Sequence, residues 1–231
     1  MLVHTLFDLL AWLVGATVAW RLRPLLLAAA PAPRAAGPLY FVAVSLGAGL
    51  GALALGTLNL QLAGRPEIGR SILGAIIGGI VGAELWKARA GVAGSTGGLF
   101  VLPLALGIAV GRVGCFLSGL DDYTWGTPTA LPWAHDFGDG VGRHPVQLYE
   151  ALAMLGFALW FGHRLRATPE AAARRGFYWF AACYALQRLA WEWLKPYPPL
   201  LGPLDLFQIA CLGLLLYAAV MLSSQPALAR R

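Results

Sequence analysis

Seven long apolar stretches follow one another along the chain, separated by short polar connections. A helix needs roughly 20 mostly apolar residues to cross a bilayer, because every backbone polar group must be satisfied within the segment. The pattern therefore predicts an all-α, polytopic membrane protein with seven transmembrane helices, folded as a single domain over residues 1–231. The predicted helices cover about residues 3–20, 38–61, 68–86, 96–117, 145–163, 176–194 and 204–222.

The first apolar stretch carries His4 and Asp8, lacks a basic start and offers no clear small-residue cleavage site. A removable secretory signal has both a basic start and such a site. We therefore expect residues 3–20 to remain in the protein as its first helix.

Glycines recur four positions apart in three of the predicted helices. They are Gly47 and Gly51, then Gly74, Gly78 and Gly82, and finally Gly107 and Gly111. Small residues at this spacing let helix backbones approach closely. The spacing predicts that the second, third and fourth helices form the tight centre of the bundle.

Composition and charge support a membrane protein and add an orientation. The chain is 58% hydrophobic and 12% charged, so it has too little polar surface to cover a soluble core. The net charge of +6 comes mostly from one set of connections and the C-terminal tail. These hold Arg21, Arg23, Arg34, Lys87, Arg89, Arg164, Arg166, Arg174, Arg175, Arg230 and Arg231, against Arg65, Arg70, Arg143 and Lys195 in the other connections. The positive-inside rule then predicts an outer N-terminus and an inner C-terminus. Basic residues do not alternate with aromatic ones in a stripe, so nucleic-acid binding is not expected.

The longest polar connection, residues 118–145, joins the fourth and fifth predicted helices on the predicted outer face. It is both acidic and aromatic, and it ends in "GRHPVQLYEAL". Pro145 is suited to the first position of a helix. Gln147 and Glu150, three positions apart, would share a face of the fifth helix at its outer mouth.

Charged side chains inside the apolar stretches are costly at membrane depth and mark functional interiors by default. Asp8 and Glu84 lie close enough to helix ends to be solvated or to pair with a neighbour. Arg188 and Glu192 are four positions apart and stack on one helix face as a possible ion pair. Arg112 has no carboxylate at that spacing on its own helix and needs a partner from elsewhere.

Three guanidinium groups, those of Arg112, Arg143 and Arg188, could converge on one site at the outer leaflet. Arginine suits bidentate capture of phosphate, and a phospholipid is the commonest anionic ligand at that depth. The residues thus predict a polar cavity that holds a phospholipid headgroup. Cys115, Cys183 and Cys211 have spacings typical of neither a disulfide framework nor a zinc site, so no metal and no cofactor is expected.

Two segments resemble the prolipoprotein diacylglyceryl transferase family: "GRVGCF" before the polar connection and "PWAHDFGDGVGRHPVQLYEAL" within and after it. The family signature Gly-Arg-x-Gly-Asn-Phe is matched by Gly111, Arg112, Gly114 and Phe116, with Cys115 in place of the asparagine. The element from Arg143 to Glu150 is the most specific match. Further along, Ser118 stands where the family has a second asparagine, and Asp121 or Asp122 stands where it has a glutamate, before Trp125 and Gly126. The pair Arg188 and Glu192 matches the late family pair, and "DLFQI" matches the start of the last helix.

The chain departs from the family pattern in the third helix. Where the family shows Ser-Phe-His-Gly-Gly, this chain has Ser71, Ile72, Leu73, Gly74 and Ala75. The family histidine is thus replaced by Leu73. The base is open between His144, whose imidazole can accept a proton, and Glu150. Cys115 raises a different possibility, a thiolate that forms a covalent intermediate.

The resemblance implies transfer of a diacylglyceryl group from phosphatidylglycerol to the lipobox cysteine of a prolipoprotein, or to a related membrane-anchored acceptor. It also implies a protein in the bacterial inner membrane with its site facing outward. We expect the protein to be a monomer. The expected catalytic residues are Arg143, His144, Glu150, Arg188 and Glu192. The expected substrate-binding residues are Arg112, Gly114, Cys115, Ser118, Gly126, Gln147 and Tyr149.

Two other classes of function remain open. A non-catalytic phospholipid-binding or lipid-moving paralogue would keep the headgroup site but would not carry out the reaction. The replacements of family residues by Leu73 and Cys115 favour this class. A transporter or channel would be expected to show internal repeats or paired broken helices, and the sequence has a single break at Pro103.

Overall fold

The computed structural model describes residues 2–29 and 37–224, and these form seven α-helices, short 3-10 turns and one small β-hairpin. The helices are α1 (Leu2–Ala29), α2 (Pro38–Leu62), α3 (Ile72–Ala90), α4 (Val101–Ser118), α5 (Val146–Ala167), α6 (Pro169–Glu192) and α7 (Leu206–Ser223). Arg34, Arg230 and Arg231, which entered the charge argument above, lie outside the described residues.

Each apolar stretch of the sequence coincides with one of these helices, so the all-α prediction is confirmed. Four segments are long and apolar enough to cross a membrane: Val3–Leu25, Pro38–Leu62, Gly97–Asp122 and Leu206–Ser223. Local chemistry sets several helix ends. Ser71 caps α3 by accepting a hydrogen bond from the Gly74 backbone N–H at 3.2 Å, and α6 begins at Pro169, earlier than expected, because proline suits a first helical turn.

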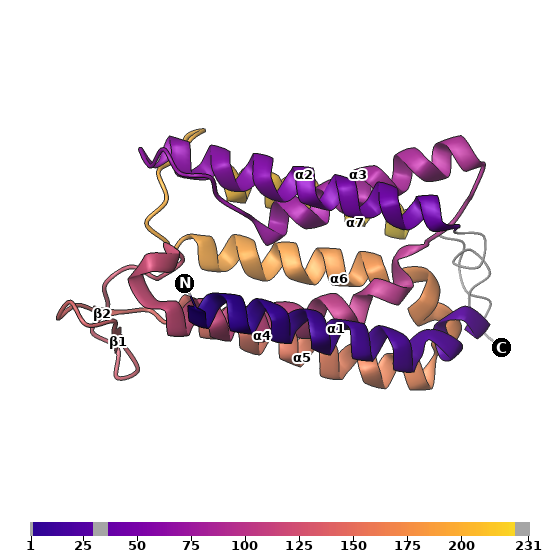
Figure 1. Ribbon diagram of the computed structural model, residues 1–231, viewed down its shortest axis with the longest axis horizontal. Helices are drawn as coiled ribbons and strands as arrows, with labels where there is room; N and C mark the ends of the chain where they lie inside the picture. Colours follow the sequence, from indigo (N-terminus) through magenta and orange to yellow (C-terminus); the bar gives the residue numbers. More distant parts are fainter. Residues whose placement is uncertain (1, 30–36, 225–231) are drawn as a thin grey trace.

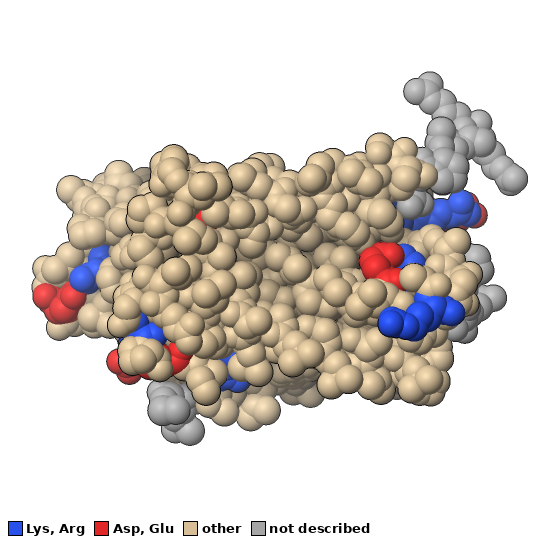
Figure 2. Space-filling model, turned by 90° about the horizontal axis from the view of Figure 1, so that it is seen from above, with Lys and Arg blue, Asp and Glu red and all other residues tan. Residues whose placement is uncertain are grey.

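The helices run roughly side by side along the long axis of the molecule (Figure 1). In that view α6 lies between an upper group of α2, α3 and α7 and a lower group of α1, α4 and α5. Charged side chains gather toward the two ends of the face drawn in Figure 2, and the band between them is almost entirely uncharged. An uncharged band of this kind is typical of a surface that faces the hydrocarbon core of a bilayer.

The glycine spacing is realised in the contact between α2 and α3. A Cβ atom added to Gly47 would lie 2.3 Å from the Gly78 carbonyl oxygen, and one added to Gly51 would lie 2.2 Å from that of Gly74. Only hydrogen at these positions allows the two backbones to touch. The expectation of a tight α2–α3 pair is therefore confirmed.

The extension of that glycine core to α4 is wrong. A Cβ atom added to Gly111 would meet nothing within 4 Å, and one added to Gly107 would meet only the Ala11 carbonyl oxygen of α1, at 3.5 Å. The fourth helix packs mainly against α1 and α5 instead. The spacing of glycines along the sequence could not show this. It identifies a helix face suited to close contact but does not say which helix packs on that face.

One end of the bundle gathers the polar connections. The start of α1, the α2–α3 connection, the hairpin of β1 (His135–Asp136) and β2 (Gly142–Arg143), and the α6–α7 connection all lie at that end (Figure 1). The hairpin is antiparallel, with His135 opposite Arg143. We call this the hairpin end.

Candidate functional site

Glu150 is the centre of a buried ion cluster near the hairpin end. It lies one turn into α5 and is 1% exposed. Its Oε2 atom lies 2.5 Å from Arg112 Nε of α4, and its Oε1 atom lies 3.1 Å from Arg188 Nη1 of α6. Lys195 donates from Nζ to the same Oε1 atom at 2.8 Å. Arg112 thus finds on α5 the carboxylate that its own helix lacks.

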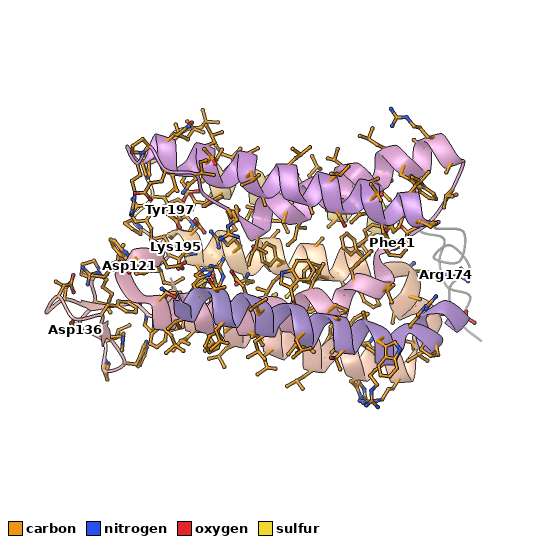
Figure 3. All side chains as sticks on the ribbon, viewed as in Figure 1. Phe41, Asp121, Asp136, Arg174, Lys195 and Tyr197 are labelled. Atoms are coloured by element: carbon orange, nitrogen blue, oxygen red, sulfur yellow. The ribbon has the colours of Figure 1, made fainter. Side chains whose placement is uncertain are left out.

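A second carboxylate completes the cluster. Arg188 Nε lies 2.7 Å from Glu192 Oε2, which confirms the expected pair, and Lys195 Nζ lies 3.8 Å from the same oxygen. Figure 3 places Lys195 toward the hairpin end of the bundle. The five members are Arg112, Glu150, Arg188, Glu192 and Lys195, and we call them the ion cluster. Three cations against two carboxylates leave it with a formal charge of +1.

Two buried polar groups beside the ion cluster have no hydrogen-bond partner among the described residues. The Gln147 side chain is fully buried, and neither its amide nitrogen nor its amide oxygen is bonded. Gln147 shares the α5 face of Glu150, as expected. Tyr184, one turn before Arg188 on α6, is 1% exposed and its hydroxyl is also unpartnered. Such groups are costly unless a ligand or water satisfies them.

Arg143 lies in the hairpin and is held there by its own loop. It donates to both oxygens of Asp139 at 2.7 Å, and its guanidinium carbon lies 5.0 Å from the centre of the Trp125 ring. The hydrogen bond with Arg143 lowers the pKa of Asp139 below its usual range. The Glu150 carboxylate therefore brings Arg112 and Arg188 together. Among the described residues, Arg143 forms its ion pair with Asp139 of the hairpin instead.

His144 and Tyr149 are neighbours at the mouth of α5. The Tyr149 hydroxyl accepts a hydrogen bond from Trp133 Nε1 at 2.7 Å and lies 3.4 Å from His144 Nδ1. Gly126 has a packing role here, since an added Cβ atom would lie 2.3 Å from the His144 carbonyl oxygen. The hairpin connection is thereby pressed against the start of the fifth helix.

The remaining expected residues lie on the α1 side of α4. A Cβ atom at Gly114 would lie 2.4 Å from Phe7 Cβ, so this glycine admits α1. Ser118 donates its hydroxyl to the Gly114 carbonyl oxygen at 2.9 Å. Cys115 is buried, and its Sγ atom lies 3.9 Å from Arg112 Nη1 and 3.9 Å from His4 Nε2.

Pairing of the peripheral carboxylates follows the expectation. Asp8 lies 3.0 Å from His4 Nδ1, and Glu84 lies 2.9 Å from Lys87 Nζ. At the start of α7, Asp205 forms a capping box with Gln208. Burial raises the pKa of Asp205 to about 6.

Sequence reasoning missed Lys195 and His4 as members of these clusters. Lys195 entered only as a charge in a connection, although its position three residues after Glu192 is the spacing of a helical neighbour. His4 entered only in the argument about the first helix. No local signal brings His4 to Cys115, because they are 111 residues apart and meet only when α1 packs on α4.

Comparison with known proteins agrees with the motifs. A family model described as prolipoprotein diacylglyceryl transferase matches residues 4–224. Relatives named phosphatidylglycerol–prolipoprotein diacylglyceryl transferase include that of Methylococcus capsulatus, 34% identical over 71% of this chain and 64% of the relative. Those of Bordetella parapertussis and Nitratidesulfovibrio vulgaris are each 37% identical, over 46% and 50% of this chain and 43% and 45% of theirs.

The matched regions thus cover about half the length of these curated relatives. The family match itself extends over nearly all of the chain. It includes α4, α5 and α6, the three helices that carry Arg112, Glu150 and Arg188. The chain therefore belongs to the prolipoprotein diacylglyceryl transferase family.

Proposed function

We propose that this chain transfers the diacylglyceryl group of phosphatidylglycerol to the lipobox cysteine of a prolipoprotein at the outer leaflet of the bacterial inner membrane. The observation that carries the proposal is the ion cluster, with its formal excess of one positive charge, beside the unpartnered amide of Gln147. An anion with hydrogen-bonding groups would balance the excess charge of this site and satisfy the Gln147 amide. The phosphoglycerol headgroup has both features.

The chemistry requires a leaving group whose negative charge is stabilised. The acceptor sulfur attacks a glyceryl carbon, a C–S bond forms, and the C–O bond to the phosphate breaks so that glycerol phosphate departs with the electron pair. Guanidinium groups fixed where this charge develops lower the barrier. Arg112 and Arg188 are fixed by Glu150, and Glu192 orients Arg188 from the other side.

The contacts of the candidate bases differ. Both oxygens of Glu150 are engaged by cations, which argues against a free lone pair for the acceptor proton. His144 is only partly buried at the outer mouth and contacts the Tyr149 hydroxyl. We assign His144 the proton-accepting role, Tyr149 and Arg143 contacts with the polar part of a substrate, and Gln147 hydrogen bonds to the headgroup.

The proposed topology has seven spanning helices, with the hairpin end outside. Basic residues support it, since Lys87 and Arg89 lie in the last turn of α3 and Arg164 and Arg166 in that of α5, at the opposite end. Fusions of green fluorescent protein and of alkaline phosphatase to the C-terminus test this orientation. A fluorescent and phosphatase-inactive chain is expected, and the reverse pattern would refute it.

The test of function is mass spectrometry of a lipobox peptide incubated with the purified protein and phosphatidylglycerol. One diacylglyceryl group should be added to the cysteine. Arg112→Gln should abolish the product, whereas Arg65→Gln, which changes a more exposed arginine paired with Glu67, should retain it. The double variant Arg112→Gln/Glu150→Gln keeps the formal charge of the cluster and controls for loss of folding.

A second candidate is a phospholipid-binding paralogue without the reaction. Leu73 favours it, because this residue is 1% exposed within the apolar core at the place where the family motif has histidine. Phosphatidylglycerol that co-purifies with the protein and is lost in Arg112→Gln, together with an unmodified peptide, would establish this candidate and refute the transferase.

A further inference from the structure

Three potential metal ligands from separate elements meet at the hairpin end, beside the ion cluster. They are His4 of α1, Cys115 of α4 and Asp122 of the short turn that follows α4, and their ligand atoms all lie within 4.8 Å of one another. His4 Nε2 lies 3.0 Å from Asp122 Oδ1 and 3.9 Å from Cys115 Sγ. The three side chains therefore surround one point.

The histidine of this group is oriented by a further carboxylate. His4 Nδ1 lies 3.0 Å from Asp8 Oδ2, one turn further along α1. The contact at Nδ1 holds the ring so that Nε2 faces Asp122 and Cys115. Metal-bound histidines commonly donate their second ring nitrogen to a carboxylate in this way.

The ligand types and distances fit zinc. Zinc binds imidazole nitrogen, thiolate sulfur and carboxylate oxygen in a tetrahedron. Its usual bond lengths place a bound nitrogen about 3.3 Å from a bound oxygen and about 3.6 Å from a bound sulfur. The distances of 3.0 and 3.9 Å between the same atoms differ from these by about 0.3 Å each. Thiolate and carboxylate together also balance the charge of a divalent ion.

Three protein ligands leave one tetrahedral position open, as in catalytic zinc sites. The His4 side chain is 32% exposed and that of Asp122 is 11% exposed, so the group is not sealed inside the bundle. Cys115 also lies 3.9 Å from Arg112 Nη1, which connects this group to the proposed phosphate site.

We propose that His4, Cys115 and Asp122 bind one zinc ion, whose open position receives the thiolate of the acceptor cysteine. The second half of this proposal rests on the proposed transferase function. On binding the metal the acceptor thiol gives up its proton, which His144 accepts as in the proposed function, and the metal-bound sulfur then attacks the glyceryl carbon. Glycerol phosphate leaves with the electrons of the broken C–O bond. The metal thereby stabilises the acceptor thiolate that remains once His144 has taken up the proton.

Metal binding is tested on the full chain, purified in detergent without a histidine tag, by zinc competition against a chromophoric chelator and by elemental analysis. One zinc ion per chain is expected. Cys115→Ser and His4→Ala should remove it, and Asp8→Asn should weaken it by about 10–100-fold. Cys183→Ser and His163→Ala, which change a thiol and an imidazole elsewhere in the chain, should bind as the unaltered protein does. Equal zinc affinity in Cys115→Ser and in the unaltered protein would overturn the site.

Cobalt(II) provides a second measurement on the unaltered protein, which no folding defect can confuse. A thiolate-to-cobalt charge-transfer band is expected in the near ultraviolet, and its absence would overturn Cys115 as a ligand. A lipobox cysteine peptide should intensify this band, and the matching serine peptide should not. An unchanged band would overturn the acceptor position. If zinc binds one to one and the band responds, yet no diacylglyceryl group is transferred, the proposed function fails and the metal site stands.

Discussion

Removal of the Glu150 carboxylate should destabilise the protein more than any change to a surface ion pair. Glu150→Gln keeps the size of the side chain and removes its charge. Arg112, Arg188 and Lys195 would then remain with side chains 6%, 4% and 0% exposed. With Glu192 as the remaining carboxylate, the formal charge of the ion cluster rises from +1 to +2.

The size of the effect follows from burial. Breaking a buried ion pair by removing one partner costs about 3–5 kcal/mol, because the other charge stays buried without compensation. In a soluble globular domain of this size, that loss would lower the melting temperature by roughly 6–20 °C. Glu67→Gln is the matched control, since Glu67 is 61% exposed and lies 3.4 Å from Arg65. An exposed pair contributes about 0–1 kcal/mol.

The assay is thermal unfolding in detergent, followed by tryptophan fluorescence, with both variants measured at the same heating rate. Lys195→Met added to Glu150→Gln restores the formal charge of +1 and should recover part of the loss, as expected for coupled neighbours. A melting temperature for Glu150→Gln equal to that of Glu67→Gln would refute the reasoning. So would a double variant less stable than Glu150→Gln alone.

The remaining predictions concern packing, ligand binding and pH. Gly47→Ala should lower the free energy of unfolding by about 1–3 kcal/mol through overpacking, since its Cβ atom would lie 2.3 Å from a carbonyl oxygen of α3. Gly49→Ala is the control: its Cβ atom would meet nothing within 4 Å, so it should leave stability unchanged or raise it. Equal melting temperatures for the two variants would contradict this. Gln147→Leu should leave the melting temperature equal or higher, because its amide is unpartnered, yet should lose co-purifying phosphatidylglycerol; lipid retention would count against its proposed role. The raised pKa of Asp205, about 6, means that the folded state binds this proton more tightly, so the contribution of Asp205 to stability is greatest below about pH 4 and falls as pH rises to 6. Asp205→Asn should remove that slope from pH-dependent melting curves, and an unaltered slope would refute the assignment.

Much of the fold could be predicted because it depends on short-range features of the sequence. Apolar length determines where helices form, Ser71 and Pro169 set two of their beginnings, and glycines spaced by four favour a close helix pair. The pairing of Arg188 with Glu192 was predictable for the same reason, since four positions span one helical turn. The short motifs around Arg112 and Arg143 also led to the family that the comparison confirms.

Tertiary structure decided which helices meet, and with it the composition of the sites. Arg112 needed a carboxylate that no local spacing could provide, and packing of α4 against α5 supplied Glu150. The glycines of α4 were assigned to the wrong neighbours, because a small-residue face is suited to any close partner. His4 and Cys115 come together only because α1 lies along α4. Sequence determines the elements and their faces, whereas contacts between distant residues arise from the packing of the whole bundle.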